Sequence, residues 1–134
     1  MKTLKLMMAS AFFAIIFSSG ALAQDSPKII AVLNRASWCS VCMANEERAV
    51  KAFQENNSDG AYQFVINDLT SKDTARKSAL EIKHLGLTEA MQPYKAAGLV
   101  CLFDAKTKEP VNQLLISLPN EDIGKAMTMF RKDR

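Results

Sequence analysis

Residues 38–42 read Trp38-Cys39-Ser40-Val41-Cys42, and they follow closely on a short apolar run, Ile29-Ile30-Ala31-Val32-Leu33. The run has the length and β-branched character of a buried strand, and the residues after the motif have the spacing of a helix. A cysteine in the first turn of a helix lies beside unpaired backbone N–H groups, which favour the thiolate over the thiol. Because the thiolate is the form that attacks disulfides, this strand–helix junction predicts thiol–disulfide chemistry at Cys39.

Cys42 lies three residues after Cys39, on the same helical face, where the two sulfurs can form a disulfide. Redox exchange is the interpretation we favour, with a metal site and an inert crosslink as alternatives. The inert crosslink is the weakest, because so short a loop constrains little of the unfolded chain. A closed zinc site needs four ligands, yet the sequence has no second Cys-x-x-Cys, and no spacing ties its one histidine, His84, to the motif.

Apolar runs separated by turn clusters continue along the chain. The cluster Asn56-Asn57-Ser58-Asp59-Gly60 ends the first helix, and Thr70 or Ser71 can cap the second. A short polar loop, Ala105–Glu109, predicts an antiparallel hairpin, whereas two strands joined through a helix should be parallel. The expected order is β-α-β-α-β-β-α. We predict strands over 28–34, 62–67, 98–104 and 110–117. We predict a first helix over 40–55, a second that begins near residue 71 and a third that begins at an Asn120 cap. Residues 87–95 should add a helical turn or two.

The first residues are typical of a secretory signal. Lys2 and Lys5 form a basic start, Leu6–Phe17 is nearly all apolar, and Gly20-Ala21-Leu22-Ala23 supplies small residues before a cleavage site. The apolar run is short for a bilayer span. We therefore expect a signal peptide over residues 1–23, cleavage after Ala23, and a mature domain over 24–134. That domain should be periplasmic or secreted, without stable insertion in the membrane.

Charge is nearly balanced outside the signal. The signal holds two of the 17 Lys and Arg residues, which leaves 15 against 14 Asp and Glu. This balance argues against nucleic acid or an anionic membrane surface as the main partner. Export also bears on the three cysteines, because in an oxidising compartment a close pair can cycle or crosslink. Cys101 is then the odd cysteine.

The motif Trp-Cys-x-x-Cys after the first strand, within this order of elements, resembles the thioredoxin family over about residues 28–130. The segment Tyr94–Cys101 is similar to the family's Tyr-x-x-x-Gly-Ile-Pro-Thr segment. The resemblance implies a thioredoxin-like α/β fold, with a central mixed β-sheet flanked by helices on both faces. It also implies that Cys39 is the attacking cysteine and Cys42 the resolving one.

Substrate docking is the second implication of the resemblance. Trp38 would form a flat apolar wall beside the disulfide, where substrate polypeptides dock, since amphipathic aromatic side chains suit partly wet contact surfaces. Leu99 and Val100, in the segment that faces the disulfide, are the further docking residues that the resemblance implies.

Three positions depart from the family pattern. Val100 stands where the family has a cis-proline, and because a cis bond before valine costs about 2.5–4 kcal/mol we expect a trans bond and an altered loop. Leu33 replaces the buried acid that accepts the proton of the resolving cysteine. The pair Ser40-Val41 lacks the proline or histidine of the best-known oxidoreductases, so no redox potential follows by analogy.

Cys101 admits two interpretations. As a small buried residue in a strand it would be inert, since apolar burial raises the pKa of a thiol. Alternatively, it could be a third thiol beside Cys39 and Cys42, either in a mixed disulfide or as a ligand for a soft ion such as Cu(I). We favour the buried, inert interpretation, because side chains alternate along a strand and one face points into the core.

The function we predict is that of a periplasmic thiol–disulfide oxidoreductase acting on protein disulfides. It needs no metal and no dissociable cofactor, but it needs a redox partner that resets the cysteine pair. Similar motifs occur at potentials from about −270 to −120 mV, so the motif is compatible with a reductase and with an oxidant. The alternative is a non-catalytic thioredoxin-like module that binds Cu(I) or a protein client.

Overall fold

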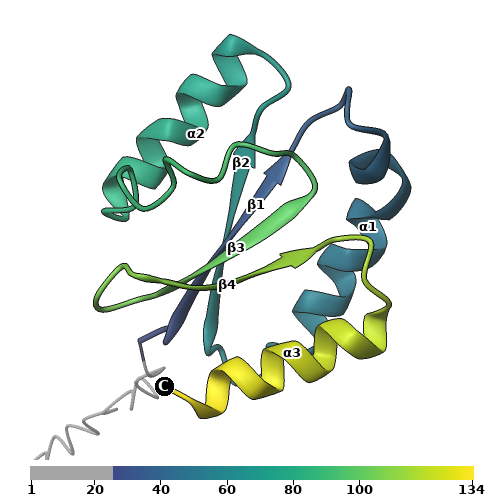
Figure 1. Ribbon diagram of the computed structural model, residues 1–134, viewed down its shortest axis with the longest axis vertical. Coiled ribbons are helices and arrows are strands. Elements are labelled where there is room, and N and C mark those ends of the chain that lie inside the picture. Colours follow the sequence, from purple (N-terminus) through teal and green to yellow (C-terminus); the bar gives the residue numbers. More distant parts are fainter. Residues whose placement is uncertain (1–25) are drawn as a thin grey trace, which may run out of the picture.

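The computed structural model describes residues 26–134, so the predicted signal peptide lies outside the described residues. The described part has the predicted β-α-β-α-β-β-α order (Figure 1). Within it, no helix combines the length and the apolar character that a membrane crossing requires. The elements are β1 (Ile29–Arg35), α1 (Ser40–Glu55), β2 (Tyr62–Asp68), α2 (Lys72–His84), β3 (Leu99–Asp104), β4 (Pro110–Leu115) and α3 (Asn120–Lys132).

The four strands form one mixed sheet in the order β2-β1-β3-β4. β1 is parallel to β2 and antiparallel to β3, and β3 and β4 form an antiparallel hairpin, as the connections predicted. β1 therefore has a neighbour on each side and helices over both faces. This position explains its composition, because a strand buried on both faces is a continuous apolar run instead of an alternating one.

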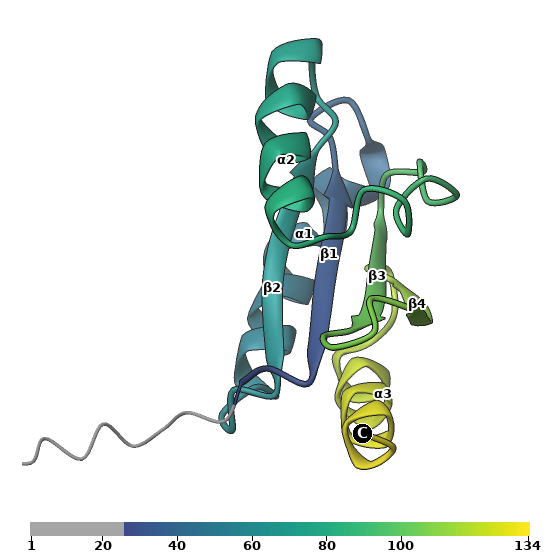
Figure 2. The ribbon, with the colours of Figure 1, turned by 90° about the vertical axis from the view of Figure 1, so that its left-hand side faces the viewer.

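Helices cover both faces of the sheet. α1 and α3 pack on one face, whereas α2 and the segment 85–98 cover the other, where that segment crosses the sheet on its way to β3 (Figures 1 and 2). Successive β1 residues alternate between the two layers. The α1/α3 core contains Ile29, Ala31, Leu33, Cys42, Ala49, Phe53, Val100, Leu102, Ile116, Ile123, Met127 and Phe130, and the α2 core contains Ile30, Val32, Val65, Ile82, Leu87, Met91, Cys101 and Phe103.

Helix starts follow the sequence closely, with one correction. α1 begins at Ser40 as predicted, and Ser71 caps α2 in a capping box with Thr74. α3 instead has Pro119 at its N-cap, and Asn120 is its first helical residue. The Asn120 side chain is engaged elsewhere, since its Oδ1 accepts a hydrogen bond from Arg48 Nη1 at 2.6 Å.

The helical turns predicted over 87–95 form only as separate turns. The Met91 amide donates to the Leu87 carbonyl at 2.9 Å, and the Tyr94 amide donates to the Met91 carbonyl at 3.0 Å. Pro93 prevents a longer helix, because it has no N–H and disfavours helical backbone at Gln92. The segment buries Leu87 and Met91 in the α2 core and then leads to the start of β3.

Candidate redox site

The motif lies where β1 ends and α1 begins (Figure 1). Cys39 is the N-cap of α1, one position before the first turn in which the sequence placed it. Its backbone is extended, with φ −87° and ψ 110°, and its Sγ accepts a hydrogen bond from the Cys42 amide at 3.2 Å. When the pair is reduced, this N–H and the positive end of the helix favour negative charge on the Cys39 sulfur.

Cys39 and Cys42 form a disulfide, with their Cα atoms 5.2 Å apart. The two sulfurs differ in accessibility. Cys39 is half-buried, whereas Cys42 is fully buried in the α1/α3 core. An external thiol or disulfide can therefore reach Cys39, while Cys42 is shielded until it acts on its neighbour. Attack by Cys39 and resolution by Cys42, which the resemblance implied, stay predictions that this asymmetry makes testable.

The turn that leads into Cys39 rests on the end of β2. The Leu69 amide donates to the Arg35 carbonyl at 2.7 Å, and the Ser37 amide donates to Thr70 Oγ1 at 3.0 Å. The indole Nε1 of Trp38 donates to the Leu69 carbonyl at 3.3 Å. Trp38 stays 66% exposed, so this bond fixes one edge of the ring while most of the ring surface faces solvent.

Arg35 ties three elements together below this turn. Its guanidinium forms ion pairs with Glu46 of α1 at 2.8 Å and with Asp68 of β2 at 3.1 Å. The hydrogen bond with Glu46 is the main reason that the pKa of Arg35 is raised. The pKa of Asp68 is lowered, chiefly by the hydroxyl and amide of Thr70 that donate to its carboxylate and further by Arg35.

Asp68→Asn should lower the free energy of unfolding at neutral pH by about 0.5–1.5 kcal/mol, the usual contribution of one hydrogen-bonded group. Because the pKa of Asp68 is lower in the folded protein than in the unfolded chain, its contribution is full above the unfolded pKa. The contribution disappears as the pH falls through the folded pKa. Urea unfolding at stepped pH should therefore show the two proteins converging in acid. A pH-independent difference, or the same convergence for the exposed Asp133→Asn control, would contradict this assignment.

The segment before β3 forms a wall against the disulfide. Gly98 has a φ of +89°, a conformation that favours glycine. A Cβ atom at Gly98 would lie 3.6 Å from Val41 Cγ1 and 3.9 Å from Cys39 Sγ, so the backbone itself lies close to the sulfur. The Gly98 amide donates to the Asn34 carbonyl at 2.7 Å, and its carbonyl accepts from the Ile116 amide at 3.1 Å.

Val100 is a paired residue of β3, and the peptide bond before it is trans, as expected. It lies opposite Leu33 of β1 and Leu114 of β4, with its side chain 1% exposed in the α1/α3 core. Leu99 is half-buried and packs against the α2 core. The structure therefore presents no Val100 side chain to a substrate, because the strand continues through the position where the family has its proline loop.

Leu33 lies in the same α1/α3 core as Cys42 and is 6% exposed. Among residues 26–134, the buried polar side chains are those of Asn34, Asn67 and Ser78, and none of these is an acid. The proton acceptor that the family pattern places at Leu33 thus has no buried replacement in the described part of the chain.

Cys101 belongs to the other layer. It lies opposite Val32 in the β1–β3 register and is buried in the α2 core, where burial raises its pKa to about 11. Because Cys42 lies in the α1/α3 core, the sheet separates the two. No group of three or more Cys, His, Asp or Glu side chains in residues 26–134 is placed to hold a metal ion. The structure does not support the three-thiolate site, and it agrees with the inert interpretation of Cys101.

Exposed apolar side chains surround the disulfide. Trp38, Val41 and Met43 are 66%, 44% and 67% exposed. Trp38 precedes Cys39 in the chain, Val41 and Met43 flank Cys42, and Val41 also lies close to Gly98. Large exposed apolar side chains beside a reactive group are typical of contact surfaces, so docking at Trp38 stays a prediction to which Val41 and Met43 can be added.

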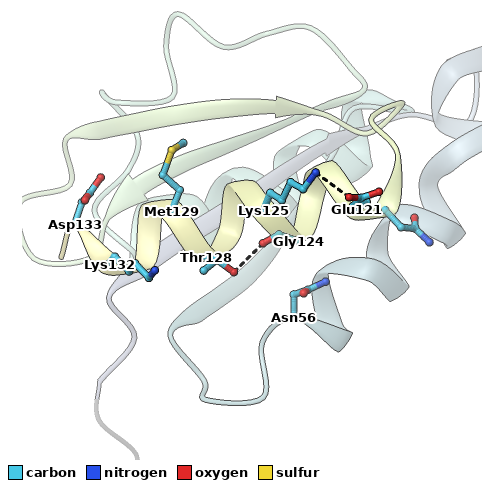
Figure 3. Close-up of a pocket in the computed structure, with 9 residues that line it drawn as sticks. Asn56, Glu121, Gly124, Lys125, Thr128, Met129, Lys132 and Asp133 are labelled. Carbon is cyan, nitrogen blue, oxygen red and sulfur yellow. Dashed lines mark hydrogen bonds and ion pairs between the residues drawn. The ribbon is translucent and has the colours of Figure 1, made fainter.

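A separate hollow lies along α3 (Figure 3). Lys125 pairs with Glu121 at 2.8 Å, and Thr128 Oγ1 donates to the Gly124 carbonyl at 3.0 Å, both within the helix. The hollow includes none of the motif residues, and its lining contains no cysteine or histidine that could take part in thiol or metal chemistry. The lining consists of Asn56, Asn120, Glu121, Gly124, Lys125, Thr128, Met129, Lys132 and Asp133.

Comparison with known proteins identifies the fold. No protein-family model and no curated protein sequence matches the chain. Among solved structures, it is similar to the crystal structure of Trxlp from Edwardsiella tarda EIB202, with a TM-score of 0.50 and 14% identity. The match covers 79% of this chain and 87% of that one. The protein thus has a thioredoxin-like fold, a mixed four-stranded sheet with helices on both faces, and carries a bonded Cys-x-x-Cys pair at the start of α1.

Proposed function

We propose that the protein is a periplasmic thiol–disulfide oxidoreductase that exchanges disulfides with protein substrates through Cys39 and Cys42. The observation that carries the proposal is the asymmetry of the pair. A half-buried sulfur caps a helix N-terminus and is bonded to a fully buried one three residues later. The arrangement supplies a stabilised thiolate for attack and a shielded thiol for release. The periplasmic address rests on the signal-like residues 1–23 alone.

Exchange in the reducing direction has two steps. The Cys39 thiolate attacks one sulfur of a substrate disulfide, an S–S bond forms between protein and substrate, and the other substrate sulfur leaves as a thiolate that takes up a proton. Cys42 then loses its proton and attacks the Cys39 sulfur, which forms the Cys39–Cys42 disulfide and releases the second substrate thiol. The substrate gains two electrons from the pair and two protons, one that Cys42 releases and one from solvent, which balances the proton that Cys39 lost on becoming a thiolate. Oxidation of a substrate is the same sequence in reverse.

Two kinds of partner follow from this chemistry. The substrates are proteins whose disulfide approaches the exposed cluster of Trp38, Val41 and Met43. The second partner is a thiol donor or a disulfide donor that returns the pair to its starting state, since each turnover leaves it with the opposite redox state. No dissociable cofactor takes part in either step.

Equilibration of the mature protein in glutathione buffers of graded potential tests the proposal. Alkylation of free thiols followed by intact mass counts the Cys39–Cys42 disulfide at each potential. A reversible midpoint is the expected result, with a low midpoint assigning a reductase and a high one an oxidant. A pair that stays in one state across the whole series would overturn the enzymatic function.

One observation favours a second candidate, a thioredoxin-like module that binds a protein client without turnover. With Leu33 in this core, none of the buried residues among 26–134 is an acid that could accept the proton of the Cys42 thiol, and this would slow the resolving step. If the protein is such a module, the exposed cluster should bind a client equally well in the oxidised and the reduced protein, and thiol–disulfide exchange should be slow in both.

Cys101→Ser should leave the exchange rate within about twofold of the wild-type value, because a buried thiol on the other side of the sheet takes no part in the reaction. The free energy of unfolding should fall by about 1–3 kcal/mol, the cost of a buried hydroxyl without a partner. Cys101→Ala separates the two effects, since it introduces no polar group. A large loss of exchange in both variants, or of Cu(I) binding, would restore Cys101 to the site.

A further inference from the structure

Asn34 is a fully buried amide in β1, where it follows the apolar residues Ile29–Leu33 and precedes the last residue, Arg35. A buried amide is costly unless its polar atoms are paired, and here they are paired in full. Its Nδ2 donates to the Tyr94 carbonyl at 3.0 Å and to the Ala96 carbonyl at 3.2 Å. Its Oδ1 accepts from Asn67 Nδ2 of the neighbouring strand at 2.9 Å.

Three of the hydrogen bonds of Asn34 go to one short segment, residues 94–98. Two come from its side chain, and its backbone carbonyl accepts the third from the Gly98 amide at 2.7 Å. The segment belongs to no helix or strand, and Lys95 and Ala96 are exposed. Tyr94 packs on the α2 core and Ala97 on the α1/α3 core, so the bonds from Asn34 hold the exposed stretch between these two contacts and the glycine that follows it.

The segment matters because of what its last residue touches. A Cβ atom at Gly98 would lie 3.9 Å from Cys39 Sγ and 3.6 Å from Val41 Cγ1. A small disulfide needs to reach only the Cys39 sulfur. A polypeptide joined to Cys39 in a mixed disulfide extends over its surroundings and must lie against this backbone as well.

We infer that Asn34 is a positioning residue for polypeptide substrates: by holding residues 94–98, it fixes the wall against which a polypeptide bound to Cys39 lies. The inference rests on the proposed function. Val100 is part of β3 and has no proline ring to stiffen the approach to the strand, so the buried amide takes over that task. A leucine of similar size would fill the space but would leave the Tyr94 and Ala96 carbonyls without their donors.

Asn34→Leu and Asn67→Leu form a matched pair of variants. Each removes one buried amide and the bond between the two asparagines, but only Asn34→Leu also removes the two side-chain bonds to the Tyr94 and Ala96 carbonyls. Two rate constants are measured for the reduced protein. The first is for its reaction with hydroxyethyl disulfide, and the second is for its reaction with a ten-residue peptide whose central cysteine is held in a mixed disulfide. We expect Asn34→Leu to lower the ratio of the peptide rate to the small-disulfide rate by about tenfold, since misplaced contacts cost rate steeply. Asn67→Leu should keep the ratio within about twofold.

An unchanged ratio in folded Asn34→Leu, or an equal fall in Asn67→Leu, overturns the inference. A wild-type protein that reacts with neither disulfide overturns the proposed function itself, so the two failures are distinguishable. Should circular dichroism show that Asn34→Leu does not fold, Asn34→Ser takes its place in the same comparison. Serine retains one donor in a smaller side chain, and its ratio is expected to fall by a smaller factor. An unchanged ratio in that variant counts against Asn34 equally.

Discussion

Cys42→Ser should turn the protein into a trap that holds its substrate in a mixed disulfide. Cys39 keeps its place at the N-cap of α1, so the first attack still occurs. The hydroxyl that replaces the buried Cys42 thiol cannot displace the substrate from Cys39, because an alcohol is far less acidic than a thiol. Turnover should fall by about 100-fold or more, as expected when one member of a two-residue catalytic unit is removed.

Intact mass spectrometry measures the trap directly. Reduced Cys42→Ser incubated with a peptide disulfide should gain the mass of one peptide half, which dithiothreitol then releases. Cys39→Ser is the matched control and should gain nothing, since the buried Cys42 thiol is out of reach of the peptide. Equal adducts on both variants would show that the two sulfurs are not distinguished by burial, and the assigned roles would fail.

Leu33→Asp should produce the largest loss of stability among the substitutions considered. The residue belongs to the same α1/α3 core as Cys42 and is 6% exposed, so the introduced carboxyl is largely removed from water, and no Lys or Arg is among the buried residues of 26–134. An uncompensated buried charge costs roughly 3–5 kcal/mol. The substitution restores the acid of the family pattern, but it does so in a core that this chain has built from apolar side chains.

The loss should depend on pH, and its sign follows from burial. Desolvation raises the pKa of the introduced carboxyl above its value in the unfolded chain, so the folded state retains its proton longer. The penalty is therefore smallest in acid and grows as the pH rises from the unfolded pKa to the folded one. Urea unfolding at several pH values measures it, with Leu33→Asn as the uncharged control. A pH-independent loss of stability, the same as for the control, would contradict the account of a dry core around Cys42.

The fold was predictable because its signals are local. The apolar run at β1, the polar turn before β4 and the Ser71 cap each specify an element from a few adjacent residues. Prediction failed where distant contacts decide the outcome. Asparagine is a favoured N-cap residue, but the Asn120 side chain accepts a hydrogen bond from Arg48 instead of capping the helix. The turns over 87–95 have helical spacing, but Pro93 limits them.

The site was predictable in its chemistry and less so in its surroundings. Cys39 and Cys42 follow from the motif, and Trp38 from its place beside them. The role of Asn34 was missed, although an asparagine in an apolar strand is a signal, because a buried amide must find partners. The Tyr94 and Ala96 carbonyls lie 60 and 62 residues further along the chain, so no local sequence pattern identifies them as its partners.

The position of Cys101 also affects how the protein reaches its own oxidised state. The three cysteines can pair as 39–42, 39–101 or 42–101, and an oxidising compartment drives all three reactions. The sheet separates Cys101 from the other two cysteines. β3 would have to detach from both β1 and β4 before the Cys101 thiol could meet either partner. In the folded protein Cys101 is therefore kept apart from Cys39 and Cys42, so the proposed exchange at the motif would leave the pairing of the protein's own cysteines unchanged.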